Sequence, residues 1–226
     1  MVITQIYSPV SKEEALKLVE LGTDYIGTVT RKELPEGPRR MLSKDQVREV
    51  FGAIRGKAVC VLIPMEPSPE DRMELCLYTG AEIVQNVNFS HEQDMEFFRL
   101  RNEKMPQLKI MKSVYVRDQG SVDAALEAVP YCDLILLDSP KEGGGGGATG
   151  KVHDWSLSKQ IIDGAGLPVI LAGGLGPDNL AQAIEALHPF GVDALTKVSV
   201  YAEDGTLLGK DLEKVSAFNK IAHSYE

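Results

Sequence analysis

Short apolar segments alternate with amphipathic segments along the whole chain. The apolar segments are rich in Val, Ile and Leu, and this composition over a few residues predicts buried parallel strands. We predict these strands at residues 2–7, 25–29, 58–63, 82–87, 108–114, 134–137, 168–171 and 192–198. Between them, apolar residues recur three and four positions apart, which predicts helices with one buried face.

Capping residues mark where several of these helices begin. Ser11 and Glu14 form a capping box, and Ser68 precedes Pro69 at the first helical position. The helices are predicted at residues 11–21, 43–55, 68–79, 90–103, 121–129, 155–162, 176–187 and 211–222. Residues 202–209 fit no regular pattern, and we expect a loose segment there.

Strict alternation of strands and helices predicts the α/β class with a parallel sheet, and eight such units close into a (β/α)8 TIM barrel. An open, doubly wound sheet is the alternative. The turn after the first strand, however, lacks the glycine fingerprint of a dinucleotide site. Barrels of about this length form one domain, so we expect residues 1–226 to form a single barrel domain.

The charge of the chain narrows its range of partners. It has 24 Lys and Arg against 33 Asp and Glu, for a formal net charge of -9. Binding to nucleic acid or to an anionic membrane requires a basic face, so we expect neither partner.

The first residues lack a basic segment followed by an apolar core, and no apolar run is long enough to span a bilayer. We therefore expect a cytoplasmic protein.

The metal-binding residue types are scattered. Cys60, Cys76 and Cys132 lie far apart among apolar neighbours, which predicts reduced core thiols rather than disulfides or a zinc site. The four histidines share no spacing. We expect no metal ion and no cofactor.

In a barrel of this kind the chemistry lies where the strands end. Polar residues and glycines stand at most of the predicted strand ends. These are Tyr7, Asn86, Asn88, Lys112, Asp138, Gly173, Gly174, Thr196 and Lys197.

Asp138 follows four apolar residues and precedes a run of five glycines at 143–147. Five consecutive glycines fit neither a helix nor a strand, which predicts a loop that closes over a small substrate. Burial beneath such a loop would raise the pKa of Asp138 and suit it to general-acid catalysis. The alternative is a solvated linker in which Asp138 caps a helix.

The glycine turn at Gly173-Gly174 predicts an anion site, because glycine lets the backbone approach a ligand and a helix begins just after it. A plain tight turn is the alternative. Lys112 and Lys197 are candidates for holding phosphate or for forming a Schiff base, or they extend to solvent as ordinary strand-end lysines. Tyr7 is a candidate proton donor or a packing residue.

These residues carry a resemblance to a known family. Leu136-Leu137-Asp138 with the glycine loop, Thr149-Gly150, Asp154-Trp155-Ser156 and Leu171-Ala172-Gly173-Gly174-Leu175 resemble motifs of phosphoribosylanthranilate isomerase. That family forms the (β/α)8 barrel of tryptophan biosynthesis. Residues 40–43 resemble its Arg-Tyr-Ile-Ser segment.

The resemblance implies an Amadori rearrangement without a cofactor. In the family, a strand-six Asp opens the aminoribose ring as general acid, which by position is Asp138. An Arg holds the anthranilate carboxylate, which by position is Arg40. Backbone amides after strands seven and eight hold the phosphate, which implies roles for Gly173 and Gly174 and, beside them, Thr196 and Lys197. Asn86, Lys112, Thr149 and Gly150 are expected to contact the substrate.

Three strand ends depart from the family pattern, and one of them is Val87, which stands where the family has a histidine after strand four. Tyr7 stands where the family has the cysteine that acts as general base, so we list Tyr7 with Asp138 as a catalytic candidate. Residues 195–199 replace a Ser-Ser-Gly-Val-Glu segment.

From these departures we expect an aldose–ketose isomerase acting on a diverged sugar or aminosugar phosphate, as a monomer or homodimer. The alternatives are an aldolase or epimerase that uses Lys112 or Lys197, or a catalytically silent sugar-phosphate-binding protein.

Overall fold

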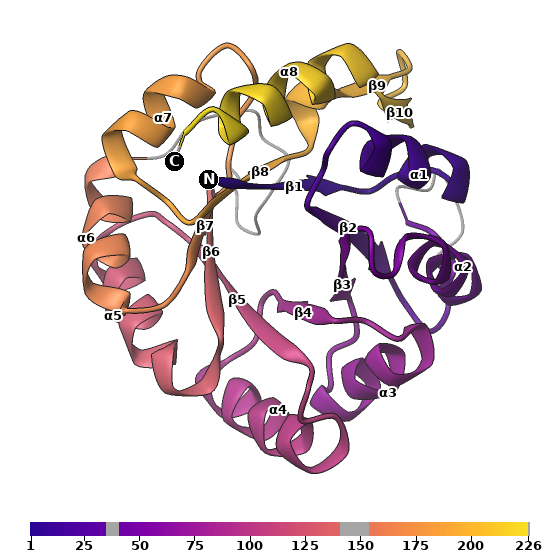
Figure 1. The fold of residues 1–226 in the computed structure, drawn as a ribbon. Helices are drawn as coiled ribbons and strands as arrows, with labels where there is room; N and C mark the ends of the chain where they lie inside the picture. The colour runs from indigo at the N-terminus through magenta and orange to yellow at the C-terminus, as the bar shows by residue number, and fades with distance from the viewer. Residues whose placement is uncertain (35–40, 141–153, 226) are drawn as a thin grey trace.

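The computed structural model describes residues 1–34, 41–140 and 154–225. Eight parallel strands form a closed barrel in the order β1 to β8, which confirms the predicted TIM barrel (Figure 1). The barrel strands are β1 (Ile3–Tyr7), β2 (Tyr25–Thr30), β3 (Val59–Pro64), β4 (Ile83–Asn86), β5 (Lys109–Tyr115), β6 (Leu134–Asp138), β7 (Val169–Leu171) and β8 (Gly191–Ala194).

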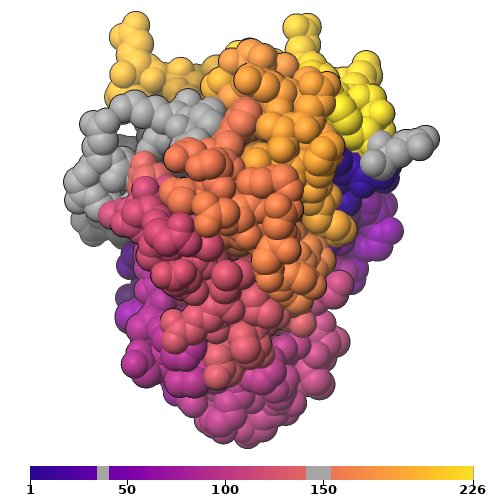
Figure 2. Space-filling view, turned by 90° about the vertical axis from the view of Figure 1, so that its left-hand side faces the viewer, coloured from indigo at the N-terminus to yellow at the C-terminus, as the bar shows by residue number. Residues whose placement is uncertain are grey.

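Helices surround the barrel, and each follows a strand as predicted (Figure 1). They are α1 (Lys12–Glu20), α2 (Lys44–Ile54), α3 (Pro69–Thr79), α4 (His91–Lys104), α5 (Gln119–Ala128), α6 (Trp155–Ala165), α7 (Leu180–Leu187) and α8 (Leu212–His223). Figure 2 shows α6 and α7 side by side on the outer surface. Serine caps recur at their starts; Ser43 and Ser90 each complete a capping box.

Two layers of apolar side chains fill the space between the helices and the strands and the interior of the barrel. The outer layer includes Phe51, Phe97 and Phe218, which are fully buried between helices and strands. The inner layer lies inside the barrel and comprises Val61, Ile83, Met111, Leu134, Leu136, Ile170 and Ala172. Because successive residues of a strand face opposite ways, a shift of one residue moves a side chain from one layer to the other.

The end of the chain differs from the prediction in two places. β8 stops at Ala194, and a short 3-10 helix (Thr196–Val198) replaces the predicted end of the strand. The segment expected to be loose forms an antiparallel hairpin of β9 (Ser199–Tyr201) and β10 (Leu207–Lys210). The Asp204-Gly205 pair between two apolar stretches is a hairpin signal that the prediction overlooked.

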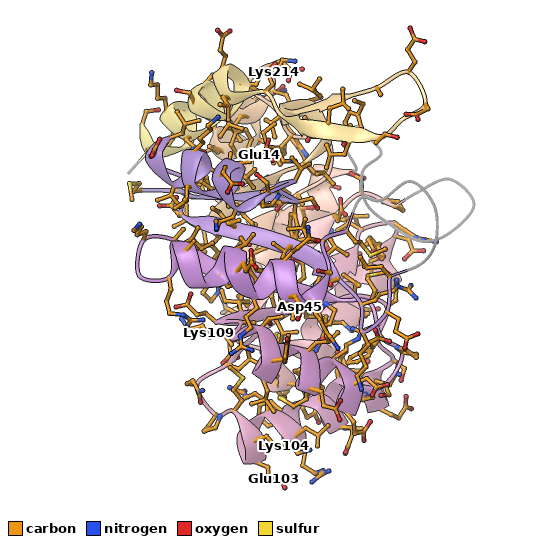
Figure 3. All side chains as sticks on the ribbon, turned by 90° about the vertical axis from the view of Figure 1, so that its right-hand side faces the viewer. Glu14, Asp45, Glu103, Lys104, Lys109 and Lys214 are labelled. Atoms are coloured by element: carbon orange, nitrogen blue, oxygen red, sulfur yellow. The ribbon has the colours of Figure 1, made fainter. Side chains whose placement is uncertain are left out.

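The hairpin lies at the end of the barrel where the strands finish. Figure 3 shows Lys109, at the start of β5, on the opposite side from the hairpin. The same view places Glu14 of α1 below the hairpin, and the backbone N–H of Lys210 donates to its Oε1 at 2.6 Å. This contact fixes the hairpin over the first strand–helix unit.

Candidate active site

A cavity of about 320 Å³ opens at the carboxyl ends of the strands. Its walls come from nearly every strand of the barrel. The polar side chains that line it include those of Tyr7, Gln85, Ser113, Asp138, Asp193 and Thr196. This position, above the apolar interior of the barrel, is where such barrels place their active sites.

Asp138 is the last residue of β6 and lines the cavity. Burial raises the pKa of its carboxyl to about 6, although the backbone N–H of Ser139, 2.7 Å from Oδ1, favours the ionised form. A carboxyl group with this pKa is protonated often enough near neutral pH to donate a proton. The geometry therefore suits the acid role that the sequence suggested.

A second carboxylate, Asp193 of β8, lines the same cavity. Gln5 Nε2 donates to its Oδ2 at 3.1 Å. Burial and the charge of Asp138 raise the pKa of Asp193 well above its ordinary value, while Gln5 and the charge of Lys210 oppose that shift. Two carboxylates in one cavity can act as a proton donor and a proton acceptor when their surroundings differ.

Sequence reasoning missed Asp193 because the predicted strand ran on to residue 198. Asp193 then stood in the middle of the strand rather than near its end. A signal was present, since Asp193 interrupts the apolar run of Val192 and Ala194. A carboxylate within a buried strand is costly, and such residues are often functional.

Tyr7, at the end of β1, is 5% exposed and lines the cavity. Its hydroxyl has no hydrogen-bond partner among the described residues. Burial, followed by the charges of Asp193 and Asp138, raises its pKa well above the usual value of about 10. Tyr7 therefore stays a neutral phenol at physiological pH.

The loop after β7 brings backbone into the cavity. Gly173 and Gly174 both have left-handed φ angles, of 88° and 68°. A Cβ atom on Gly173 would lie 2.2 Å from Ser139 Oγ, so only glycine fits beside the end of β6. Asn179 holds the loop by donating to the Gly174 carbonyl oxygen at 3.1 Å and accepting from the Gly176 N–H at 2.9 Å.

Thr196 and Lys197 face this loop from the 3-10 helix after β8, and both line the cavity. The hydroxyl of Thr196 is buried and has no partner among the described residues. The ammonium of Lys197 lies 2.7 Å from Asp178 Oδ2. Together with Gly173 and Gly174, these residues form one wall that carries hydrogen-bond donors and one cation.

Lys112 and Asn86, which we expected to contact the substrate, are not among the residues that line the cavity. The ammonium of Lys112 pairs with Asp94 of α4 and donates to the carbonyl oxygen of Phe89 at 3.1 Å. Asn86 accepts from the Arg72 guanidinium of α3 at 3.4 Å. Both residues lie on the outer face of the sheet, one position away from cavity residues.

The neighbours that face the cavity instead are Gln85 and Ser113. Gln85 Nε2 donates to Ser113 Oγ at 2.8 Å, and Gln85 Oε1 is buried without a partner among the described residues. This pair adds a neutral polar strip between β4 and β5. An unpaired buried amide oxygen inside a cavity is suited to accept a hydrogen bond from a substrate hydroxyl or amine.

Comparisons with known proteins decide the family. The family model described as N-(5'phosphoribosyl)anthranilate (PRA) isomerase matches residues 11–220. The chain belongs to the PRA isomerase family. A relative of that name from Rubrobacter xylanophilus is 34% identical over 184 residues, covering 81% of this chain and 83% of the relative.

Solved structures of this family share the fold. The PRA isomerase of Thermotoga maritima is 26% identical with a TM-score of 0.81, covering 99% of this chain and 100% of that one. A PRA isomerase in complex with reduced 1-(o-carboxyphenylamino)-1-deoxyribulose 5-phosphate is 24% identical with a TM-score of 0.78, over 99% and 100% of the two chains.

Several residues that the resemblance singled out lie outside the described residues. These are Arg40, Thr149, Gly150 and the glycine run at 143–147.

Among the described residues, no cluster of three or more His, Cys, Asp or Glu could hold a metal ion. None of the described helices is long and apolar enough to cross a membrane.

Proposed function

We propose that this protein isomerises N-(5'-phosphoribosyl)anthranilate to its aminoketose phosphate by acid–base catalysis. The observation that carries the proposal is the place of Asp138. It is a carboxyl with a pKa of about 6, at the end of β6, in the cavity of a chain that belongs to the PRA isomerase family. The relatives' shared name supplies the substrate.

Asp138 acts as the general acid in this account. It donates its proton to the ring oxygen of the aminoribose, the C1–O bond breaks, and the nitrogen lone pair forms an imine at C1. Loss of the C2 proton then gives an enolamine, which becomes the ketose when C1 gains a proton and the C2 hydroxyl loses one. The rearrangement only moves protons and electron pairs within the substrate, so it needs no oxidant, reductant or cofactor.

The phosphate is assigned to the wall formed by Gly173, Gly174, Thr196 and Lys197. The left-handed glycines allow close backbone approach, the Thr196 hydroxyl is an unpaired donor, and Lys197 brings a positive charge. From the resemblance, Arg40 is assigned to the anthranilate carboxylate and Thr149 and Gly150 to the substrate. Tyr7 is assigned a packing role at the rim, because its phenol does not ionise at neutral pH.

A diverged sugar or aminosugar phosphate is the second candidate substrate, and Tyr7 favours it. The ring of Tyr7 occupies part of the cavity at a position where the family has a smaller cysteine. An aldolase or epimerase route is less well supported. Lys112 lies outside the cavity and Lys197 is paired with Asp178, so neither is a desolvated, unpaired amine ready to form a Schiff base.

A catalytically silent binding protein is also less well supported, because binding alone does not require an acid with a raised pKa in the cavity.

We further propose that residues 1–226 act as one domain in the cytoplasm, as a monomer or homodimer. These assignments come from the sequence.

The test is turnover of N-(5'-phosphoribosyl)anthranilate by the purified protein and by Asp138→Asn. We expect formation of the ketose by the wild type and a loss of about 10³-fold in kcat for the variant. Asp123→Asn, a matched change on the exposed face of α5, should leave kcat unchanged. Equal turnover by wild type and Asp138→Asn would contradict the proposal. Turnover of a different sugar phosphate alone would favour the diverged substrate.

A further inference from the structure

We propose that Asp193 is the general base of this protein and removes the C2 proton of the substrate. This inference rests on the proposed isomerase function. It concerns the step for which the chain lacks the family's cysteine.

Neither Tyr7 nor any thiol suits the role of base. The Tyr7 phenol has a pKa raised well above its usual value by burial and by Asp193 and Asp138. None of the three cysteines lines the cavity. Burial raises the pKa of Cys60 and of Cys132 to about 12 and that of Cys76 further still, so all three stay protonated.

Asp193 has the geometry that a base requires. It is 7% exposed, and it lines the cavity beside Tyr7, at the strand adjacent to β1 in the barrel. Gln5 holds one of its oxygens, Oδ2, at 3.1 Å. Because Asp193 lines the cavity, its carboxylate is within reach of a bound substrate. Within the described part of the chain, Asp138 and Asp193 are the only carboxylates that line this cavity.

The groups around Asp193 act on its pKa in opposite directions, and together they raise it well above its ordinary value. Burial and Asp138 on β6 disfavour its ionised form, whereas Gln5 on β1 and Lys210 on β10 favour it. Lys210 is itself 7% exposed, and burial lowers its pKa to about 8, so it carries a positive charge at neutral pH. Its ammonium donates to Ser199 Oγ at 2.7 Å, which holds it within the hairpin.

The hairpin thus has a role in the site. It replaces the loose segment that the sequence suggested, and it brings a buried cation to the side of the barrel where β8 and β1 meet. The charge of Lys210 favours the ionised form of Asp193, which is the form that accepts a proton, and so opposes the effects of burial and of Asp138.

The step assigned to Asp193 is a simple proton transfer. Its carboxylate takes the C2 proton of the protonated imine, the C2–H electron pair forms the C1–C2 double bond, and the imine pair returns to nitrogen. The product is the neutral enolamine and a protonated Asp193. No oxidant or reductant takes part.

The test compares the wild type with Asp193→Asn and Tyr7→Phe on substrate carrying deuterium at C2. We expect Asp193→Asn to lower kcat by about 10²- to 10⁴-fold with little change in KM, and to increase the isotope effect on kcat. Tyr7→Phe should lower kcat far less than Asp193→Asn does. In Asp193→Ala, added formate should restore part of the activity, because a small carboxylate can fill the vacated space; Asp193→Asn leaves no such space.

The outcomes separate the two proposals. Turnover by wild type together with near-normal turnover by Asp193→Asn would overturn the role of Asp193 and leave the isomerase function standing. Loss of activity without an increased isotope effect and without formate rescue would also overturn it, since it would indicate a structural role. Loss in Tyr7→Phe equal to that in Asp193→Asn would reassign the base. Absence of turnover by the wild type would overturn both proposals.

Discussion

The ring of Tyr7 fits at the end of β1 only because residue 27 on β2 is glycine. The two residues are register partners in the barrel, and a Cβ atom on Gly27 would lie 2.4 Å from Tyr7 Cε1 and 2.6 Å from Cδ1. Tyr7 in turn packs with Ile63 and Val87 around the rim of the cavity. The replacement of the family's cysteine by tyrosine is therefore matched by space on the neighbouring strand.

Gly27→Ala should destabilise the protein because the tyrosine ring must move. Overpacking of this kind costs about 1–3 kcal/mol in the free energy of unfolding, which urea denaturation measures. Combining it with Tyr7→Ala should cost less than the sum of the two single changes. Gly52→Ala is the control: nothing lies within 4 Å of its added Cβ in α2, so we expect a gain of about 0.5–1 kcal/mol. Additive costs for Gly27→Ala and Tyr7→Ala would show that the ring does not rest against Gly27.

Asp138→Asn should make the protein more stable at neutral pH while removing its activity. The folded-state pKa of about 6 lies above the ordinary value of about 3.9. The folded state therefore binds more protons between these values, and wild-type stability falls as the pH rises from about 4 to about 6. The neutral amide avoids this loss, so we expect an advantage of about 2 kcal/mol at pH 7 that fades toward pH 4. Urea unfolding at several pH values measures the difference, and a variant less stable than wild type at pH 7 would contradict it.

Thr196→Val tests the phosphate wall. The buried hydroxyl lacks a partner, so its removal should raise the free energy of unfolding by about 1 kcal/mol without ligand. The same change removes a hydrogen bond to a charged phosphate, worth about 1.5–3 kcal/mol, and should raise KM about tenfold or more. Thr28→Val is a matched control, because its hydroxyl is also buried and unpaired among the described residues but does not line the cavity. It should gain stability with no change in KM; equal KM values for both variants would contradict the phosphate assignment.

Lys112→Met should affect stability rather than catalysis. Its side chain is 13% exposed and pairs with Asp94, which is 7% exposed, so the change leaves a buried carboxylate without its partner. We expect a loss of about 3 kcal/mol in the free energy of unfolding, with kcat/KM within threefold of wild type. The double variant Lys112→Met/Asp94→Leu should recover most of the stability. A large fall in kcat/KM with normal stability would instead indicate that Lys112 acts in the active site.

The sequence was sufficient for the barrel because its strands and helices repeat in strict alternation and the helices start at clear caps. The sequence alone did not show which strand side chains face the cavity and which face the helices. Lys112 and Ser113 are neighbours, and only the register of β5 decides that Ser113 faces the cavity and Lys112 faces α4.

The region after β7 shows a second limit of prediction from the sequence. The turn chemistry of Gly173 and Gly174 is local, so the sequence alone singled out both residues, and both line the cavity. Asp193 and Lys210 were not found, because their importance depends on where β8 ends and on a hairpin that carries a buried lysine back to the barrel. Such contacts between distant segments leave little trace in local patterns.

The most direct test of the account is the pH dependence of kcat/KM for N-(5'-phosphoribosyl)anthranilate, measured for wild type and Asp138→Asn. If Asp138 is the acid, wild-type kcat/KM should decline as the pH rises through about 6, because the proton to be donated is lost. The variant should be about 10³-fold slower and lack that decline. A wild-type decline that persists unchanged in Asp138→Asn, or full activity of the variant, would contradict the account.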